Sequence, residues 1–427
     1  QVFGNPHSAN LTSTASTELV ERVRRAVLAF FDAPDEYTAI FTLNASSALK
    51  LVGEAYPFRP GGRFLLTFDN HNSVNGIREF ARAGGARVEY APMTFPELRI
   101  DRLQLDRLLT APSDGASDAP RLFAFPAQSN FSGVQHPLDL VARAKAAGWD
   151  VLLDAAAFVP TNPLDLRSIR PDFVALSFYK MFGYPTGVGC LIARLDALNR
   201  LERPWFAGGT VNFVSVQGRR HILSPREAGF EDGTLNFLSI PAVEIGLEYL
   251  ASIGMTRIHD HVAALTQTLL HELVALHHDN GRPMVRVYGP VTAEARGGTV
   301  TMNLYDPEGH LLDYRRIEEL ASAARISLRT GCFCNPGSAE TAEGLTEEDM
   351  VEAAAQGDMT LPRFLQMIQH RGGKSAGALR VSLGIASNLA DVRAFLDFVA
   401  GFRNQSRLAI GDVTFDINSC RVIRDGS

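Results

Sequence analysis

The sequence predicts an α/β protein in which a large domain with a mostly parallel sheet is followed by a smaller α+β domain. In the first part of the chain, short apolar runs alternate with longer stretches of helical periodicity, which is typical of a parallel sheet covered by helices on both faces. After about Ala242, long helical stretches come first and a few strands follow. The chain is 46% hydrophobic and 21% charged, an ordinary composition for a globular protein.

The large domain is predicted to open with a helix over residues 17–31, whose apolar residues recur at helical spacing and which Ser16 or Thr17 can cap. Apolar runs then predict strands over residues 37–43, 63–68, 86–92, 121–126, 150–156 and 172–180. Helical periodicity between them predicts helices from Ser47 onward and over residues 74–83 and 138–148. Ligands of such sheets bind at the carboxyl ends of the strands, where Asp154 and Lys180 lie.

The smaller domain is predicted from two long helices, over residues 243–254 and 257–278, and from a helix that begins at Tyr314. Its strands are predicted over residues 285–289, 298–305 and 377–384. We therefore expect three parts along the chain: a large domain over residues 1–245, a small domain over 246–402, and a tail or the beginning of a further domain over 403–427.

Composition and charge exclude several classes of protein. The net charge of −6 gives no basic surface for nucleic acid, and no apolar stretch approaches the roughly 20 residues that span a membrane. The four cysteines form no CxxC pair and are too few for a disulfide framework, so we expect a cytoplasmic protein. The chain begins at Gln1, without a methionine, and we expect that a further segment precedes it.

Lys180 stands out in the stretch "SFYKMFGYPTGVG", which runs from Ser177 to Gly189. The apolar run before it predicts a buried strand that ends at this lysine. Burying an ammonium group without a partner is costly, so Lys180 is neutral, paired or used covalently. A lysine that extends from the strand end into solvent is the alternative that the local pattern leaves open.

Pyridoxal phosphate chemistry requires a lysine, an acid facing the pyridine nitrogen, donors for the phosphate and a cation for the substrate carboxylate. Lys180 can supply the first, and Asp154, which ends the apolar strand in "WDVLLDAA", can supply the second, although a capping aspartate explains Asp154 equally well. Ser46 and Ser47 lie between a strand and a helix, where they can bind a phosphate or simply cap the helix. The sequence contains neither a GxGxxG nor a GxxxxGK[ST] motif, so it gives no support for dinucleotide binding or for a P-loop.

Seven stretches resemble motifs of the class V aminotransferase superfamily, and they are most similar to the cysteine desulfurase-like domain of molybdenum cofactor sulfurases. These are "DNHNSVNGIREFA", "QSNFSG", "LLDAAAFVPTNPLDL", "SFYKMFGYPTGVG", "FEDGTLNFLSI", "LRTGCFCNPG" and "LRVSLG". The resemblance runs from about Asn5 to about Phe402. It implies the fold type I of pyridoxal phosphate-dependent transferases, with pyridoxal 5′-phosphate as cofactor, and a homodimer.

The resemblance also implies roles for the residues around the cofactor ring. Lys180 would form the Schiff base, Asp154 would pair with the pyridine nitrogen and His71 would stack on the ring. Asn130 would reach the ring hydroxyl. The sequence departs from many desulfurases at Ala157, where they carry a glutamine. This departure weakens the case for a desulfurase that serves iron–sulfur clusters and leaves the sulfurase resemblance intact.

Further roles concern the phosphate and the substrate. By resemblance, Ser46, Ser177 and Tyr179 would hold the phosphate, and Thr234 would reach a phosphate across the dimer interface. Arg380 would bind the substrate carboxylate through its two-pronged guanidinium, a geometry that lysine does not reproduce.

Cys334 is the residue that decides the reaction. By resemblance, its thiolate would attack the substrate sulfur from a mobile loop, and Arg329 would favour the thiolate by its charge. Cys332 would assist it or be only a neighbour. A CxC metal site is one alternative, but the nearby sequence offers no further ligand pair, and buried inert cysteines are another.

The resulting expectation is an enzyme that converts L-cysteine to L-alanine and leaves a persulfide on Cys334, with sulfurase-like transfer of the sulfur to an acceptor that the sequence does not identify. A C–S or other β-lyase, or an aminotransferase that acts on another amino acid, is the second hypothesis. A non-catalytic scaffold that binds a sulfur carrier is the third. Small-molecule amino acids are the expected substrates in the first two, and no metal is expected.

Overall fold

The computed structural model describes residues 3–6, 8–112, 119–355, 377–406, 413–416 and 421–424, and these form two compact units. Unit 1 comprises residues 1–92, 102–127 and 137–259, and unit 2 comprises residues 93–101, 128–136 and 260–427. The predicted boundary after residue 245 falls within helix α10 (Pro241–Ile253) and stays a prediction. The predicted tail lies partly outside the described residues. Within the described ranges, no helix has the length and apolar character needed to cross a bilayer.

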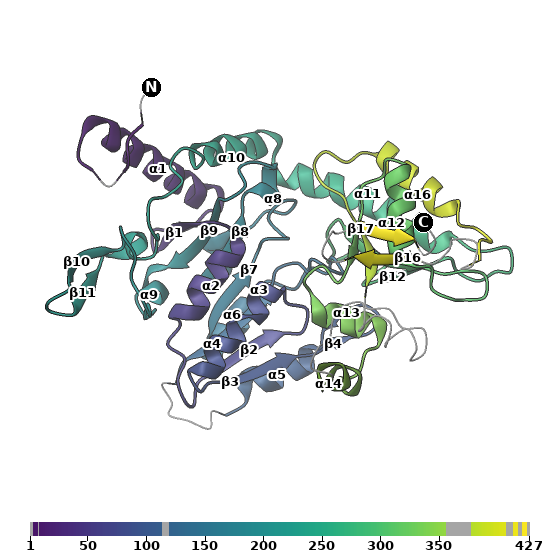
Figure 1. Ribbon diagram of the computed structural model, residues 1–427, viewed down its shortest axis with the longest axis horizontal. Coiled ribbons are helices and arrows are strands. Elements are labelled where there is room, and N and C mark those ends of the chain that lie inside the picture. Colours follow the sequence, from purple (N-terminus) through teal and green to yellow (C-terminus); the bar gives the residue numbers. More distant parts are fainter. Residues whose placement is uncertain are drawn as a thin grey trace. The chain divides into compact units, whose positions relative to one another are not determined.

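Unit 1 is built around a seven-stranded sheet with the order β1-β9-β8-β7-β6-β2-β3 (Figure 1). The strands are β1 (Tyr37–Thr42), β2 (Arg63–Thr67), β3 (Arg87–Ala91), β6 (Arg121–Pro126), β7 (Asp150–Asp154), β8 (Phe173–Ser177) and β9 (Gly189–Arg194). All neighbouring strands are parallel except β9, which runs antiparallel to β1 and β8. The predicted mostly parallel sheet is confirmed, while β9 had not been expected from the sequence.

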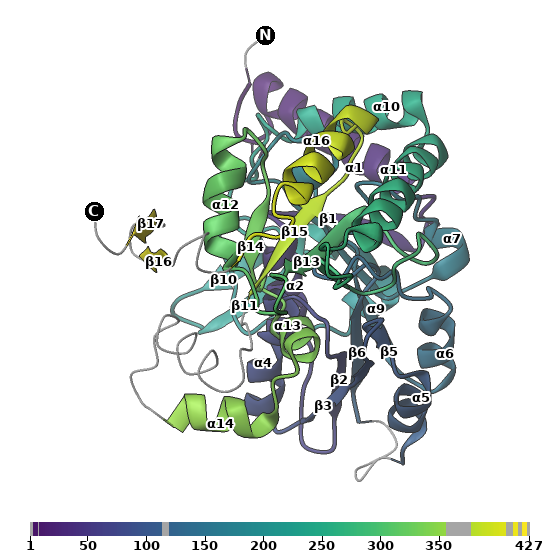
Figure 2. The same cartoon turned by 90° about the vertical axis from the view of Figure 1, so that its right-hand side faces the viewer.

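Helices cover this sheet. α2 packs on β8, β9 and α4, and Figure 2 shows α4 on one side of β2 and β6 with α5 and α6 on the other. Leu49 and Val52 of α2 are fully buried in one apolar cluster with strand residues such as Phe64, each contributing about 1.5–3 kcal/mol of burial energy. The helices of unit 1 are α1 (Leu11–Phe30), α2 (Ala45–Ala55), α3 (Asn72–Asn75), α4 (Ile77–Ala83), α5 (Arg102–Thr110), α6 (Leu140–Ala146), α7 (Leu166–Ile169), α8 (Tyr179–Phe182), α9 (Leu195–Leu198), the 3-10 helix η1 (Arg226–Gly229) and α10.

Two helix starts differ from the predictions. The expected cap of α1 at Ser16 or Thr17 is wrong, because the helix begins at Leu11, where Asn10 Oδ1 accepts the N–H of Ser13 at 3.0 Å. The hydroxyls of Ser16 and Thr17 donate instead to carbonyls one turn earlier, which satisfies them inside the helix.

α2 likewise begins at Ala45 rather than Ser47, with Asn44 as its cap. The helix predicted over residues 74–83 is divided at Gly76 into α3 and α4. A hairpin of β10 (Val211–Ser215) and β11 (Arg220–Leu223) had no counterpart in the predictions. Its mostly exposed strands lack the buried apolar runs on which strand prediction rests.

Unit 2 contains a four-stranded antiparallel sheet with the order β12-β13-β15-β14. The strands are β12 (Val285–Tyr288), β13 (Thr299–Leu304), β14 (Arg329–Gly331) and β15 (Ala378–Ser382), with short pairs β4 (Met93–Thr94) with β5 (Arg99–Ile100) and β16 (Val413–Asp416) with β17 (Arg421–Arg424). The helices are α11 (Met255–Ala275), α12 (Tyr314–Ala323), α13 (Pro336–Glu343), α14 (Glu347–Ala355) and α16 (Leu389–Ala400). Leu269 and Leu273 of α11 pack in one buried cluster with Met302 of β13, so a core of its own supports the predicted α+β character.

Candidate active site

Polar residues gather at one edge of the sheet of unit 1. β2, β6, β7 and β8 run parallel to one another, and β1 points the same way because β9 is antiparallel to both β1 and β8. Asp154 and Ser177 are the last residues of β7 and β8, while Asn44 and His71 follow β1 and β2. The carboxyl edge of a parallel sheet is where ligands bind, and four strand ends bring candidate groups to it.

Asp154 and Lys180 both act on His71. The pKa of His71 lies below its ordinary value because burial disfavours the charged imidazolium; the negative charge of Asp154 opposes this decrease and the positive charge of Lys180 adds to it. Asp154 is buried, and its Oδ1 accepts the N–H of Ala156 at 3.0 Å. A capping aspartate makes the same kind of contact, so this hydrogen bond is consistent with the alternative interpretation of Asp154. It involves only one of the two carboxylate oxygens.

His71 is oriented by the helix that it caps. Its Nδ1 accepts the backbone N–H of Ser73 at 3.1 Å, so the proton of the neutral ring is on Nε2. The hydroxyl of Ser73 lies 3.0 Å from the same nitrogen and 2.6 Å from the hydroxyl of Ser46. The predicted stacking residue therefore has a fixed, neutral ring, and Ser73 connects it to a predicted phosphate residue.

The predicted phosphate serines lie at the start of α2. Buried Ser177 accepts the N–H of Ala45 through its hydroxyl at 2.7 Å, which ties the end of β8 to this helix terminus. Ser46 is exposed there. Ser47 does not cap the helix, because Asn44 Oδ1 accepts the Ser47 N–H at 3.0 Å. The arrangement presents hydroxyl groups at a helix N-terminus, where an anion is favoured.

Lys180 lies beyond the end of its strand. The prediction of a strand that ends at this lysine is wrong, because β8 ends at Ser177 and Lys180 belongs to the single turn α8. Its side chain is exposed, as is that of Tyr179. Gly183 ends the turn with a φ of 82°, a left-handed conformation that glycine adopts without strain. The lysine predicted to form the Schiff base thus lies on a short turn at the carboxyl edge.

Thr234 also belongs to unit 1 and has an exposed side chain. Together with Ser47 and Gly187 it lines a cavity of about 280 Å³. Its hydroxyl accepts the side-chain N–H of Asn5 at 3.4 Å. Thr234 and Ser47 thus line one cavity of the same copy, whereas the predicted contact of Thr234 with the phosphate of a second copy stays a prediction.

The predicted cysteine pair lies in unit 2, between β14 and α13. Cys332 and Cys334 are exposed, whereas Phe333 and Asn335 between and after them are buried. Asn335 caps α13, its Oδ1 accepting the N–H of Ser338 at 3.2 Å. Buried inert cysteines, one alternative for this pair, are excluded here.

Arg380 and Asn130 lie beside this segment. The guanidinium of Arg380 stands 4.5 Å from the centre of the Phe333 ring and donates to the backbone oxygen of Asn130 at 2.8 Å. The pKa of Arg380 falls to about 10, because burial and the nearby Arg329 disfavour the cation more strongly than Cys334 favours it. Arg380 remains charged at neutral pH, and its buried Nε–H has no hydrogen-bond partner among the described residues.

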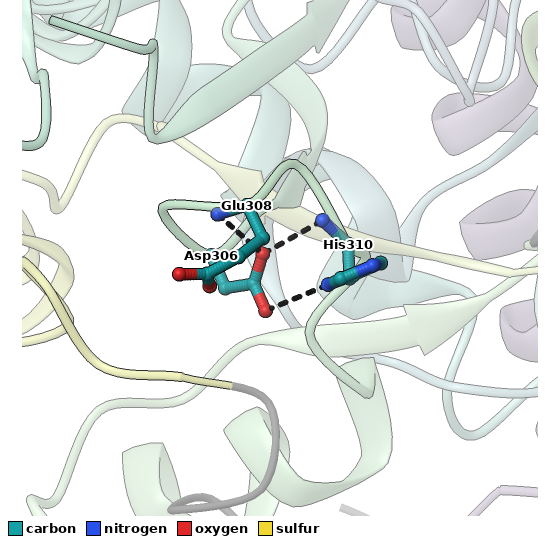
Figure 3. A group of neighbouring side chains, drawn as sticks. All are labelled: Asp306, Glu308 and His310. Atoms are coloured by element: carbon teal, nitrogen blue, oxygen red, sulfur yellow. Dashed lines mark hydrogen bonds and ion pairs between the residues drawn. The ribbon is translucent and has the colours of Figure 1, made fainter. Parts of the chain in front are cut away.

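A separate group in unit 2 consists of Asp306, Glu308 and His310 (Figure 3). The side-chain atoms of these residues that can ligate a metal ion lie within 4.8 Å of one another. The buried carboxylate of Asp306 accepts the backbone N–H groups of Glu308 at 3.0 Å and His310 at 2.7 Å, and it lies 3.2 Å from His310 Nδ1. These contacts account for Asp306 as the residue that closes this loop.

The donor set fits pyridoxal phosphate. At the carboxyl edge a buried carboxylate and an exposed lysine both act on the neutral imidazole of His71, beside serine hydroxyls at a helix N-terminus. Sequence reasoning missed Ser73, Asn44 and Asn335. The motif "NPGS" carried a usable signal for Asn335, because asparagine followed by proline is typical of a helix start.

The chain is similar to known proteins over most of its length. The model of the family Aminotransferase class-V matches residues 1–395. A molybdenum cofactor sulfurase of Arabidopsis thaliana is 37% identical over 93% of this chain and 52% of its own length. The human protein of that name is 37% identical over 95% of this chain and 47% of its own length. The chain thus spans about half the length of these relatives.

The fold is similar to that of a solved cysteine desulfurase from Thermococcus onnurineus. The TM-score is 0.75 at 25% sequence identity, and the match covers 93% of this chain and 87% of that protein. The predicted fold type I is confirmed.

Proposed function

The chain belongs to the aminotransferase class-V family, and we propose that it is a pyridoxal 5′-phosphate-dependent enzyme that removes the sulfur of L-cysteine. The proposed products are L-alanine and a persulfide on Cys334. The observation that carries the proposal is that the Cys334 thiol is exposed while the residues on both sides of it are buried. A thiol that accepts sulfur must be accessible to the substrate, and its neighbours must hold it in a defined orientation.

The cofactor, when bound, supplies an electron sink for the α-carbon of the substrate. In this proposal Asp154 would hold a proton at the pyridine nitrogen, and the neutral ring of His71 would stack on the cofactor. Asn130 would reach the ring hydroxyl. Lys180 Nζ holds the cofactor and, once the substrate has replaced it, takes the α-proton as a general base.

The sulfur step balances without a further reactant. Cys334 Sγ, as the thiolate, attacks the substrate sulfur, and the new S–S bond forms as the C–S bond breaks. The electron pair of the broken bond stays on the β-carbon, which takes a proton and becomes the methyl group of alanine. Arg380 holds the substrate carboxylate during this step, through N–H groups other than the one that binds the Asn130 carbonyl.

We also place Thr234 at the phosphate of a second copy, in a homodimer. Support comes from the many exposed apolar side chains of unit 1, which include Phe213, Val216 and Ile222 on the β10–β11 hairpin and Ile245 on α10. Exposed apolar patches mark protein interfaces. We expect Val216→Asp to raise the monomer fraction in light scattering, whereas Val351→Asp on α14 of unit 2 leaves it unchanged. An unaltered dimer in Val216→Asp would contradict this assignment of the interface.

The molybdenum cofactor is the sulfur acceptor that we infer from the names of the sulfurase relatives. A cytoplasmic location fits an exposed thiol such as Cys334, because a reducing compartment keeps it free.

Product analysis tests the reaction. The protein, loaded with pyridoxal phosphate and given L-cysteine, is expected to form alanine. Pyruvate with ammonia would identify a β-lyase, and an oxo acid would identify an aminotransferase. Absence of any product together with absence of cofactor absorbance would leave only a binding role.

A further inference from the structure

Asn130 and Asn335 link the two sides of the Cys334 segment through their side-chain amides. Asn335 Nδ2 donates to Asn130 Oδ1 at 2.9 Å, and Asn130 Nδ2 donates to the carbonyl oxygen of Phe333 at 2.8 Å. Asn335 is fully buried. The residues before and after Cys334 are therefore both bound to one side chain, which comes from a distant part of the sequence.

The donors and acceptors of these hydrogen bonds determine the orientation of both side-chain amides. Asn335 Oδ1 accepts the N–H of Ser338, so only its Nδ2 is available to Asn130. Asn130 must then present Oδ1 to Asn335 and Nδ2 to Phe333. Rotating either amide by half a turn would break two hydrogen bonds of the chain.

The backbone of this segment needs such support. Phe333 and Cys334 have φ values of 56° and 57°, the left-handed region that is unfavourable for residues with a Cβ. The ring of Phe333 is fixed from two sides, by the guanidinium of Arg380 at 4.5 Å and by the ring of Phe131 at 5.6 Å. Together with the Asn130 bond, these contacts hold a backbone that directs Cys332 and Cys334 outward.

The far end of α13 is fixed as well. Glu343, its last residue, accepts hydrogen bonds at 2.8 Å from Tyr288 and from Asn303. Asn335 therefore connects Cys334 to a helix that is anchored at its other end to the sheet of unit 2.

We propose that Asn335 is a positioning residue that directs the Cys334 thiol for sulfur transfer, by fixing the amide of Asn130 and through it the Phe333 carbonyl. This role deepens the proposed function and rests on it. Capping alone would require only the side-chain oxygen of Asn335, whereas positioning requires its Nδ2 donor as well.

The experiment separates these two roles. Asn335→Ser keeps an oxygen that caps a helix but lacks the side-chain amide whose Nδ2 reaches Asn130. Asn388→Ser is the matched control, because Asn388 caps α16 in the same unit. The loaded protein is mixed with L-cysteine, the single-turnover rate of persulfide formation is followed by mass spectrometry, and the KM is measured. Hydrogen exchange of the peptide over residues 329–335 is measured without substrate, since the N–H of Asn335 binds the carbonyl of Cys332 at 3.0 Å.

In Asn335→Ser we expect persulfide formation to slow about 10- to 100-fold, as for a misplaced reacting group. The KM should change less than about threefold because Arg380 binds the carboxylate, and exchange at residues 329–335 should accelerate about tenfold. Asn388→Ser should alter none of these. A persulfide rate or an exchange rate in Asn335→Ser equal to that of Asn388→Ser would overturn the proposal. A wild-type protein that forms no persulfide would overturn both the proposed function and this role in it, even if exchange still accelerated.

Discussion

The carboxyl edge of unit 1 and the cysteine segment of unit 2 present reactive groups in different ways. At the edge, Asp154 and Ser177 are buried at strand ends, and charges act directly on His71. In the segment, the Cys334 thiol is exposed and only its neighbours are fixed. Substitutions at the edge should therefore impair every reaction of the cofactor, whereas substitutions in the segment should impair sulfur transfer and leave cofactor binding intact.

The largest effect is expected for Lys180→Ala. Alanine formation should fall by about three orders of magnitude, because the general base is lost, and the absorbance of the Schiff base should disappear. Lys180→Arg keeps the charge and should fail equally. Normal turnover in either variant would remove Lys180 from the reaction.

Unit 1 also contains a buried ion pair. Arg24 donates to both carboxylate oxygens of Glu231, at 2.7 and 3.1 Å. Arg24→Ala should lower the free energy of unfolding by about 3–5 kcal/mol, because it leaves a carboxylate buried without its partner. Arg22→Ala, which removes a partly exposed ion pair with Glu244, should lower the free energy of unfolding by less than about 1 kcal/mol. Denaturant unfolding measures both, and equal losses would refute this difference.

Beside the cysteine segment, Arg380→Lys should raise the KM for L-cysteine about 10- to 100-fold, since a charge-assisted pair loses its second hydrogen bond. Cofactor affinity should not change. Arg286→Lys is the control, because Arg286 also lies over an aromatic ring of unit 2, that of Tyr305 at 5.1 Å. An unchanged KM in Arg380→Lys would assign the carboxylate to another residue.

The smallest effect concerns the titration of His71. Its pKa should lie below the unfolded value of about 6.5, because burial lowers it. Below that pH the unfolded chain binds the proton before the folded chain does, so the contribution of His71 to stability decreases as the pH falls. Asp154→Asn removes the charge that raises this pKa and should lower it further. An NMR titration that shows an increase would contradict the assigned environment.

The fold was predictable from the sequence where burial is continuous. Runs such as the one ending at Asp154 identify central strands of the sheet without further information. The strand predicted to end at Lys180 ends three residues earlier, at Ser177. An apolar run does not distinguish a strand from the short turn α8 that follows it. The exposed hairpin β10–β11 has no such run, and it was missed.

The sequence predicted which residues form the candidate site, but not the hydrogen bonds that hold them in place. Lys180, Asp154 and Cys334 were identified from motifs, whereas the link between Asn130 and Asn335 joins residues 205 positions apart. Local patterns contain no information on such a pairing. Asn44 was missed as the cap of α2 because the serines after it offered an equally good explanation.

Intact-protein mass spectrometry after incubation with pyridoxal phosphate and L-cysteine tests the central claim most directly. Wild type and Cys332→Ala should each gain the mass of one sulfur atom and form alanine, and Cys334→Ala should do neither. A gain of sulfur that persists in Cys334→Ala, or alanine formed at the wild-type rate without Cys334, would contradict the assignment of Cys334 as the sulfur acceptor.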